Sequence, residues 1–261
     1  MKRIFFFFSE KQTSVRSAAT VLMSMVLLSR VLGLVRDRLL AARFDPDVLG
    51  VYFAAFRIPN LVFELLVMGT LTAAFIPVFT KYVTDGKEGE AWHISSTLIH
   101  ICTILFALFS LPLLFYTDAV CRLIAPGFTH TQIIQMSEFT RFMIVFQVFP
   151  LLIGNFFTGI LQSYNLFFAP AAAPVIYNIG IIIAIVTLTP LLGIWAPVVG
   201  VGIGAVLFIC IQIPSLIAIG YTHKPVIDLA HKGVQEVGKL MAPRTVGLAV
   251  SQVDTTVDLV L

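Results

Sequence analysis

The sequence predicts an all-α protein that crosses a membrane several times, for three reasons. Hydrophobic residues make up 58% of the 261 residues and charged residues only 12%, whereas soluble domains average about 45–50% and about 25%. The mean hydropathy is +0.96. The apolar residues gather in repeated runs, each long enough to cross a hydrocarbon core of about 30 Å as a helix. We therefore expect a polytopic helical membrane protein.

Residues 1–16 are predicted to be a cytoplasmic tail. Basic residues surround the run Phe5–Phe8, which we expect to rest near the lipid headgroups. A cleaved signal peptide is the alternative, but the apolar run after Arg16 continues to Arg30 without a small-residue cleavage site. We therefore expect the tail to lead directly into the first membrane span.

Residues 17–221 are predicted to form a bundle of six membrane spans. The first covers about residues 17–42, and the second, at about 49–83, is too long for one straight crossing. We expect Pro59, Gly69 and Pro77 to bend or interrupt this second span. The other four are expected at about residues 93–116, 137–164, 168–188 and 196–221, with a polar segment at 117–136 outside the hydrocarbon core.

Prolines and glycines in the later spans predict where these helices bend and where they pack closely. Pro150 and Gly154 indicate a kink in the fourth span. Two prolines fall in the first turns of the fifth span, where proline is best tolerated. The sixth span contains three small residues that allow close helix packing in a membrane: Gly200, Gly202 and Gly204.

Residues 222–238 are predicted to be a cytoplasmic connection, and 239–261 the start of a seventh helix. Because that helix is still apolar at Leu261, we expect this chain to be the front part of a longer protein. Orientation follows from the loop charges, since Lys and Arg concentrate on the cytoplasmic side. With the N-terminus inside, the outer loops hold only Arg43 and Arg122, and the inner ones hold Lys2, Arg3, Lys11, Arg16, Lys81, Lys87, Lys224, Lys232 and Lys239.

Ionisable residues in the first two spans are the main functional candidates. Such groups are tolerated in hydrocarbon only when they are paired or face a water-filled cavity. At 100° per residue, Arg30 and Asp37 share nearly one helix face, and Arg36 points roughly 120° away from Arg30. A structural alternative is that Asp37 neutralises a neighbouring arginine, while Arg38 and Arg43 extend to the interface. That alternative is weakest for Arg30, which lies deepest.

Arg57, just before Pro59, adds a third guanidinium. Three arginines converging on one cavity would suit a phosphate or pyrophosphate, because the guanidinium fork binds such oxygens bidentately. Glu64 could form a structural ion pair, or accept a sugar hydroxyl or a proton. Asp254 and Asp258, four residues apart, share a face; they indicate either coupling to a cation such as Na⁺ or H⁺, or simply a wet helix face.

Several classes of function are disfavoured. The five histidines and three cysteines lack metal-ligand spacing, so we predict no metal and no other cofactor. No Ser/His/Asp set, P-loop or dinucleotide fingerprint is present, so an enzyme is not predicted. The net charge is only +3, and the sequence has no basic patch interleaved with aromatic residues. Nucleic acid is therefore disfavoured as a partner.

With these residues in view, the sequence resembles the MurJ/MviN family, the lipid II flippases of bacterial peptidoglycan synthesis. The resemblance covers nearly everything after Arg16. It is carried by SRVLGLVRD (29–37), AAFRIPNL (54–61), AAFIPVF (73–79), APGF (125–128), FP with GILQSYNLFFAPAAAPVIYN (149–178), QIPSL (212–216) and MAPRTVGLAVSQVD (241–254).

The resemblance implies the N-terminal lobe, six helices and part of a seventh, of a roughly fourteen-helix flippase in the bacterial inner membrane. Lipid II, an undecaprenyl-pyrophosphate carrying a muropeptide, would be the cargo, and the second half of the same transporter a partner. The motif match assigns substrate binding to Ser29, Arg30, Arg36, Asp37, Arg57 and Asn60. The sequence departs from the family pattern at Gly50, Phe63, Glu64 and Met68, where the family usually has other charges.

Two other functions stay open at this point. One is an exporter of another lipid-linked oligosaccharide, or a cation-coupled drug antiporter of the same superfamily, which would rely on Glu64, Asp254 and Asp258. The other is a membrane scaffold that transports nothing and recruits partners.

Overall fold

A computed structural model describes residues 15–64 and 74–241, and this part of the chain is helical with no strand. The prediction of an all-α polytopic membrane protein is confirmed. In chain order the elements are α2 (Val15–Ala41), α3 (Pro46–Ala55), α4 (Arg57–Phe63), α5 (Ile76–Thr84), α6 (Glu88–Phe115), α7 (Thr117–Ile124), α8 (His130–Met143), the π-helical η3 (Ile144–Val148), α9 (Phe149–Ser163), α10 (Phe168–Leu192), α11 (Trp195–Cys210) and α12 (Ile213–Ala218).

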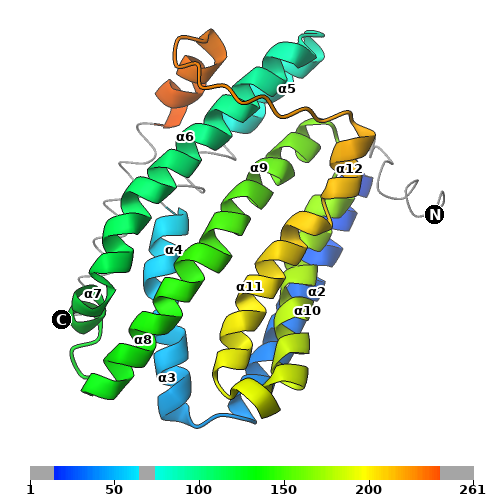
Figure 1. The fold of residues 1–261 in the computed structure, drawn as a ribbon. Coiled ribbons are helices and arrows are strands. Elements are labelled where there is room, and N and C mark those ends of the chain that lie inside the picture. The colour runs from blue at the N-terminus through cyan, green and yellow to red at the C-terminus, as the bar shows by residue number, and fades with distance from the viewer. Residues whose placement is uncertain (1–14, 65–73, 242–261) are drawn as a thin grey trace.

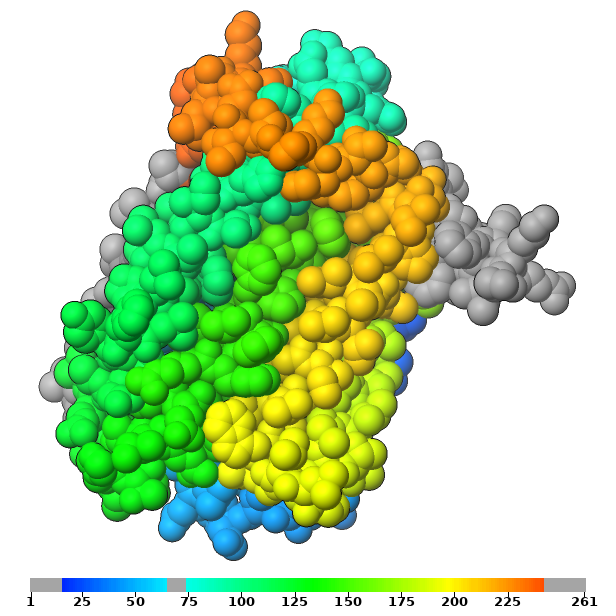
Figure 2. Space-filling view, viewed as in Figure 1, coloured from blue at the N-terminus to red at the C-terminus, as the bar shows by residue number. Residues whose placement is uncertain are grey.

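Five helical stretches among the described residues are long and apolar enough to cross a membrane. Figure 1 shows them running alongside one another, with α2 behind α10 and α11. In the space-filling view, α6, α8, α9 and α11 form one continuous face (Figure 2). The predicted spans one, three, four, five and six therefore exist as long helices, at Arg16–Ala41, Glu88–Phe115, His130–Ser163, Phe168–Leu192 and Trp195–Ala218.

The second predicted span is interrupted, as the sequence indicated. It is divided into α3, α4 and α5, with a break at Phe56. Pro59 has no N–H to donate to the carbonyl of Ala55, four residues earlier. The Thr140 hydroxyl on α8 donates to that carbonyl instead, at 3.1 Å. Pro77 stands at the start of α5, and the predicted bend at Gly69 lies outside the described residues.

The fourth span differs at its start and is distorted where predicted. It begins at His130 rather than near residue 137, because Thr129 and Gln132 form a capping box. The segment 117–136, predicted to be a polar stretch between spans, holds the short helix α7 and the first turns of α8. The π-helical turns of η3 end two residues before Pro150, which lacks the N–H that a regular α-helix needs there.

The glycines of α11 allow the close packing that the sequence predicted. A Cβ added to Gly204 would lie 2.6 Å from the Tyr177 carbonyl oxygen of α10, and one on Gly200 would lie 3.1 Å from Ile181 Cα. Gly202 faces the Phe142 ring of α8 instead. α10 and α11 are therefore in backbone contact, and α10 in turn supports α2.

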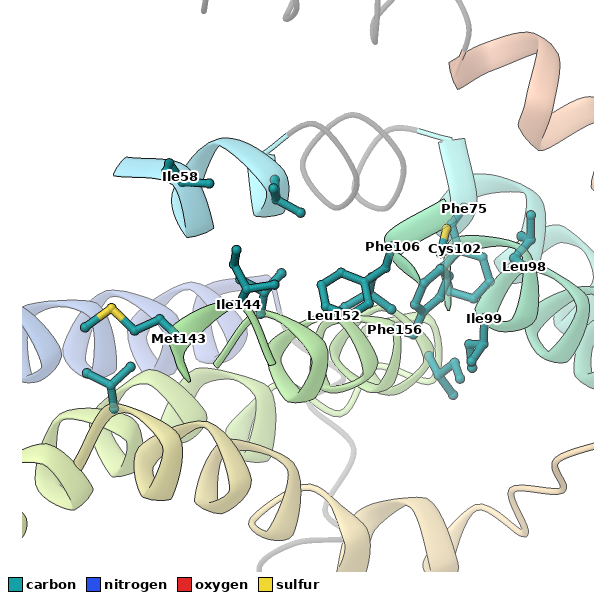
Figure 3. Close-up of a cluster of buried hydrophobic side chains, with 14 of the residues drawn as sticks. Ile58, Phe75, Leu98, Ile99, Cys102, Phe106, Met143, Ile144, Leu152 and Phe156 are labelled. Carbon is teal, nitrogen blue, oxygen red and sulfur yellow. The ribbon is translucent and has the colours of Figure 1, made fainter. Parts of the chain in front are cut away.

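The hydrophobic core lies where α4, α6 and the α8–α9 helix meet (Figure 3). Ile58 of α4 approaches it from one side and Leu98 and Phe106 of α6 from another. Ile144 and Leu152, fully buried, fill the centre. This packing fixes α4 and η3 next to each other, and both border the cavity described below.

Residues 222–231 cross the end of the bundle without helical structure and lead into a helix at 232–241. This crossing segment, which we call the strap, lies near the α5–α6 turn (Figure 1). The helix thus begins inside the segment 222–238 that the sequence assigned to a connection. Its continuation through 239–261 remains a prediction, because residues 242–261 lie outside the described part.

Candidate functional site

A polar junction joins α2 to α10 in the middle of apolar sequence. The Arg36 Nε and Nη2 groups both donate to Asp37 Oδ1 at 2.9 Å, and Arg36 Nη1 donates to Asn178 Oδ1 at 3.1 Å. Asn178 Nδ2 is within 3.1 Å of both Ser29 Oγ and the Pro174 carbonyl oxygen, to which it can donate. Asn178 therefore connects the two ends of the SRVLGLVRD motif.

Arg36 opens onto a cavity of about 490 Å³, a size typical of pockets that hold small ligands. The walls come from α2, α3, α4, η3, α9 and α10. The lining residues are Arg36, Tyr52, Phe53, Phe56, Asn60, Phe63, Gln147, Val148, Leu151 and Tyr177. Most of this surface is aromatic or aliphatic, so the few polar groups would determine how a ligand is oriented.

The Arg36 guanidinium keeps unused hydrogen-bonding capacity. Its side chain is 26% exposed, and three of its five N–H groups donate in the bonds described above. The remaining two have no partner among the described residues and suit an oxyanion in the cavity. Because Asp37 already balances the charge, the site holds a positioned donor fork rather than an isolated buried cation.

The structure does not bring the three predicted arginines into one cavity. Arg57 lines a separate pocket of about 470 Å³ against Ala125, Gly127 and Phe128 of the APGF motif. Arg30 is exposed and has no hydrogen bond or ion pair to the part of the chain that the structure describes. The helical rotation of roughly 120° between Arg30 and Arg36, and the break at Phe56, explain why the three diverge.

The other predicted residues are placed as follows. Asn60 is exposed and lines the Arg36 cavity, while Ser29 and Asp37 belong to the α2–α10 junction. Glu64 lies half-buried at the end of α4. Asp254 and Asp258 lie outside the described residues. Arg43 donates to the Ile185 carbonyl of α10, so it is tied to the bundle.

Sequence reasoning missed Asn178, Gln147, Tyr52 and Tyr177. Asn178 and Gln147 are amide side chains inside strongly apolar helices, and both are buried. A lone amide in such a run is a signal that could have been used, because a buried polar group requires a partner. The two tyrosines carry no comparable signal, since an aromatic residue in an apolar helix is most often part of the core.

Four of the five histidines meet at the strap. His100 Nε2 lies 3.2 Å from His223 Nε2, and His93 Nε2 lies 3.1 Å from Asp228 Oδ2. His231 Nε2 lies 3.8 Å from a Glu90 carboxylate oxygen. Within the described residues these contacts form pairs, and no group of three or more His, Cys, Asp or Glu side chains could hold a metal.

A chain of hydrogen bonds at the strap joins the Tyr221 hydroxyl, the rings of His223 and His100, and the Val226 carbonyl. His100 Nδ1 lies 2.9 Å from the Val226 carbonyl oxygen, to which it donates, and His100 Nε2 faces His223 Nε2. His223 Nδ1 can accept from the Tyr221 hydroxyl at 3.3 Å. Burial, and secondarily the neighbouring His100, lowers the pKa of His223. In the folded protein His223 is therefore protonated less readily than a free histidine.

A bundle of membrane-length helices around a cavity with a half-buried guanidinium fork defines a multi-pass helical membrane protein. Residues 40–261 match the family described as lipid II flippase MurJ, so the chain belongs to this family. The resemblance found in the sequence is thereby confirmed.

Two curated relatives illustrate the match. The chain is 27% identical over 243 residues to the probable lipid II flippase MurJ of Buchnera aphidicola subsp. Acyrthosiphon pisum, covering 90% of this chain and 47% of that protein. It is 28% identical over 245 residues to the lipid II flippase MurJ of Burkholderia cenocepacia, covering 89% and 46%. The chain thus spans about half the length of these relatives.

Solved structures agree with the fold. A lipid II flippase MurJ in an inward closed conformation superposes with a TM-score of 0.72 at 25% identity, over 92% of this chain and 50% of that one. An outward-facing multidrug resistance MATE family transporter of the MOP superfamily gives a TM-score of 0.71 at 13% identity, over 97% and 55%. The second match shows a shared fold only.

Proposed function

We propose that this protein is part of a lipid II flippase, which moves an undecaprenyl-pyrophosphate-linked muropeptide from the inner to the outer leaflet of the bacterial inner membrane. The observation that carries the proposal is the Arg36 guanidinium, held at the wall of a cavity of about 490 Å³, where two of its N–H groups have no partner among the described residues. Family membership supplies the identity of the cargo.

The proposed role of Arg36 is to hold the pyrophosphate. Two unused N–H groups match two oxygens of a diphosphate, and such charge-assisted bonds are stronger than neutral ones. Asp37 and Asn178 keep the fork in place, so little side-chain entropy is lost when the ligand binds. Asn60 of α4, which lines the same cavity, would also contact the bound group.

Transport is proposed to follow alternating access between this lobe and the second half of the transporter. α2 packs mainly on α10 and leaves Met23, Leu27 and Leu34 each at least 65% exposed. In a bilayer such side chains are covered by lipid tails or by another lobe. Coupling to Na⁺ or H⁺ is assigned to Glu64, Asp254 and Asp258, as carboxylates within membrane helices are typically used. No covalent step is involved, so the protein is not an enzyme.

The N-terminus is proposed to lie in the cytoplasm. The start of α2, the α5–α6 turn and the strap lie at one end of the bundle (Figure 1), and the lysines at positions 81, 87, 224, 232 and 239 belong to that end. The opposite end holds Arg43 and Arg122 in its connections. This asymmetry favours the lysine-rich end as the inside.

Complementation tests the proposal. Arg36→Ala in the complete transporter should abolish growth of a strain depleted of its lipid II flippase, while Arg122→Ala, on the exposed surface of α7, should support growth. Membrane levels of both variants are measured by immunoblot. Growth of the Arg36→Ala strain at normal protein levels would refute the role assigned to the cavity.

A further inference from the structure

Gln147 is a buried amide with an unused acceptor at the wall of the Arg36 cavity. It lies in η3, is only 6% exposed, and lines the cavity together with Arg36 and Asn60. Its Oε1 atom is fully buried and has no hydrogen-bond partner among the described residues. An acceptor in this state has lost its hydration without gaining a replacement, which is unfavourable.

The second buried glutamine of the bundle provides a comparison. Gln212 is completely buried, yet its Oε1 accepts from the Thr158 hydroxyl at 3.1 Å. Its Nε2 donates to the carbonyls of Gly154 at 3.1 Å and Phe208 at 3.0 Å. A glutamine in a structural role is therefore satisfied on both atoms in this protein, and Gln147 is not.

The backbone around Gln147 is also unusual. η3 is a π-helical stretch within an otherwise α-helical span, and such insertions frequently occur at functional sites. The wider turn of a π-helix rotates the side chains of η3 relative to the directions they would have if α8 continued as a regular α-helix. In this structure it places Gln147 and Val148 together on the cavity wall.

We propose that rotation of the Gln147 carboxamide turns Oε1, buried in the structure without cargo, toward the cavity, where it accepts a hydrogen bond from the sugar part of the cargo, from a hydroxyl or an amide N–H group. The inference rests on the proposed function, in which Arg36 holds the diphosphate of the same molecule. A carboxamide oxygen only accepts hydrogen bonds and disfavours an oxyanion beside it. Oε1 is therefore not a suitable partner for the oxygens of the diphosphate. The cavity thus has a donor subsite at Arg36 and an acceptor subsite at Gln147, and Gln147 determines specificity for a glycosylated lipid.

The test compares two probes in lipid nanodiscs containing the complete transporter. One probe is a bare polyprenyl diphosphate, and the other is the same lipid carrying an N-acetylated disaccharide. Gln147→Met keeps the length of the side chain and removes the acceptor, and Gln147→Leu is measured in parallel. Gln162→Met makes the same change on α9 outside the cavity, and serves as the matched control.

The expected result is selective. Gln147→Met should weaken binding of the disaccharide lipid by about threefold to tenfold, the value of one neutral hydrogen bond. Binding of the bare diphosphate should stay within about twofold of wild type, and Gln162→Met should match wild type for both probes. Because no existing bond is lost, the melting temperature of Gln147→Met should not fall.

Two kinds of result would overturn the inference, and they differ. If Gln147→Met and Gln147→Leu bind both probes as wild type does, or weaken both equally, Gln147 does not contact the sugar although the flippase proposal survives. If the wild type binds neither probe, or Arg36→Gln leaves both affinities unchanged, the proposed function fails and this inference fails with it.

Discussion

The Arg36 guanidinium of α2 and the Asn178 carboxamide of α10 are joined by a hydrogen bond of 3.1 Å between residues 142 positions apart. Asn178 is itself anchored, since its amide nitrogen lies 3.1 Å from the Ser29 hydroxyl oxygen and from the Pro174 carbonyl oxygen. The orientation of the candidate ligand-binding arginine is therefore set by a second helix.

Asn178→Leu should weaken binding of a polyprenyl diphosphate by about tenfold, because the Arg36 fork loses its second fixed partner. Asn178→Asp should not restore binding, since its carboxylate still accepts from Arg36 but places a second negative charge beside the diphosphate. The measurement is a titration by microscale thermophoresis. Asn155→Leu is the control, because within the described residues that amide donates only to the Leu151 carbonyl of its own helix. Equal affinities for Asn178→Leu and wild type would refute the positioning role.

Thr140→Val should destabilise the bundle by about 1–3 kcal/mol, because the Ala55 carbonyl would be left buried without a donor. Restoring the backbone N–H with Pro59→Ala should reduce that cost in the double variant. Thermal unfolding in detergent is measured for the wild type, the two single variants and the double variant, which together form a double-mutant cycle. Thr20→Val, which removes a bond to a carbonyl of its own exposed helix, is the control with little expected effect. Additive changes would contradict this account of the break.

Gly204→Ala should destabilise the α10–α11 contact by about 1–3 kcal/mol, since the new Cβ would stand 2.6 Å from a backbone oxygen that cannot rotate away. Gly33→Ala in α2 meets nothing within 4 Å and should be neutral or slightly stabilising. Both are compared by melting temperature. A stable Gly204→Ala protein would mean that α10 and α11 are farther apart than described.

The strap should detach more readily in acid. The pKa of His223 is lowered in the folded protein, so the detached strap binds a proton more readily. The contribution of His223 to strap attachment is therefore complete above the ordinary histidine pKa of about 6.5, and it is lost as pH falls from that value through the lower pKa of the folded protein. The facing groups are His100 of α6 and Tyr221. The pKa of Asp228 is also lowered, mainly by His93, but its effect appears only near pH 4 and below.

Hydrogen exchange of the amides at 222–224 and 226–228 measures this directly. Protection should be lower at pH 5.5 than at pH 7.5, after correction for the intrinsic exchange rate. His223→Gln keeps an amide in place of the ring but does not titrate, so the difference should shrink. Equal protection at the two pH values in the wild type would show that the histidine pair does not control the strap.

Much of the candidate site was accessible from the sequence. Charged residues in apolar helices identified Arg36 and Asp37, and the motif around Pro59 identified Asn60. The partner Asn178 and the acceptor Gln147 were missed, because neither belongs to a charge pattern. The expectation that Arg30, Arg36 and Arg57 converge was wrong, since it depends on how two helices are rotated against each other.

The sequence by itself determined the all-α membrane fold, the number and order of most spans, and the family. These follow from local properties, namely run length, hydropathy and short motifs, which need no knowledge of neighbouring helices. Only the tertiary structure decided that Arg36 opens onto a cavity and Arg57 onto another, and that Thr140 serves the carbonyl freed by Pro59. Those outcomes depend on contacts between residues 85 or more positions apart, which local sequence patterns do not encode.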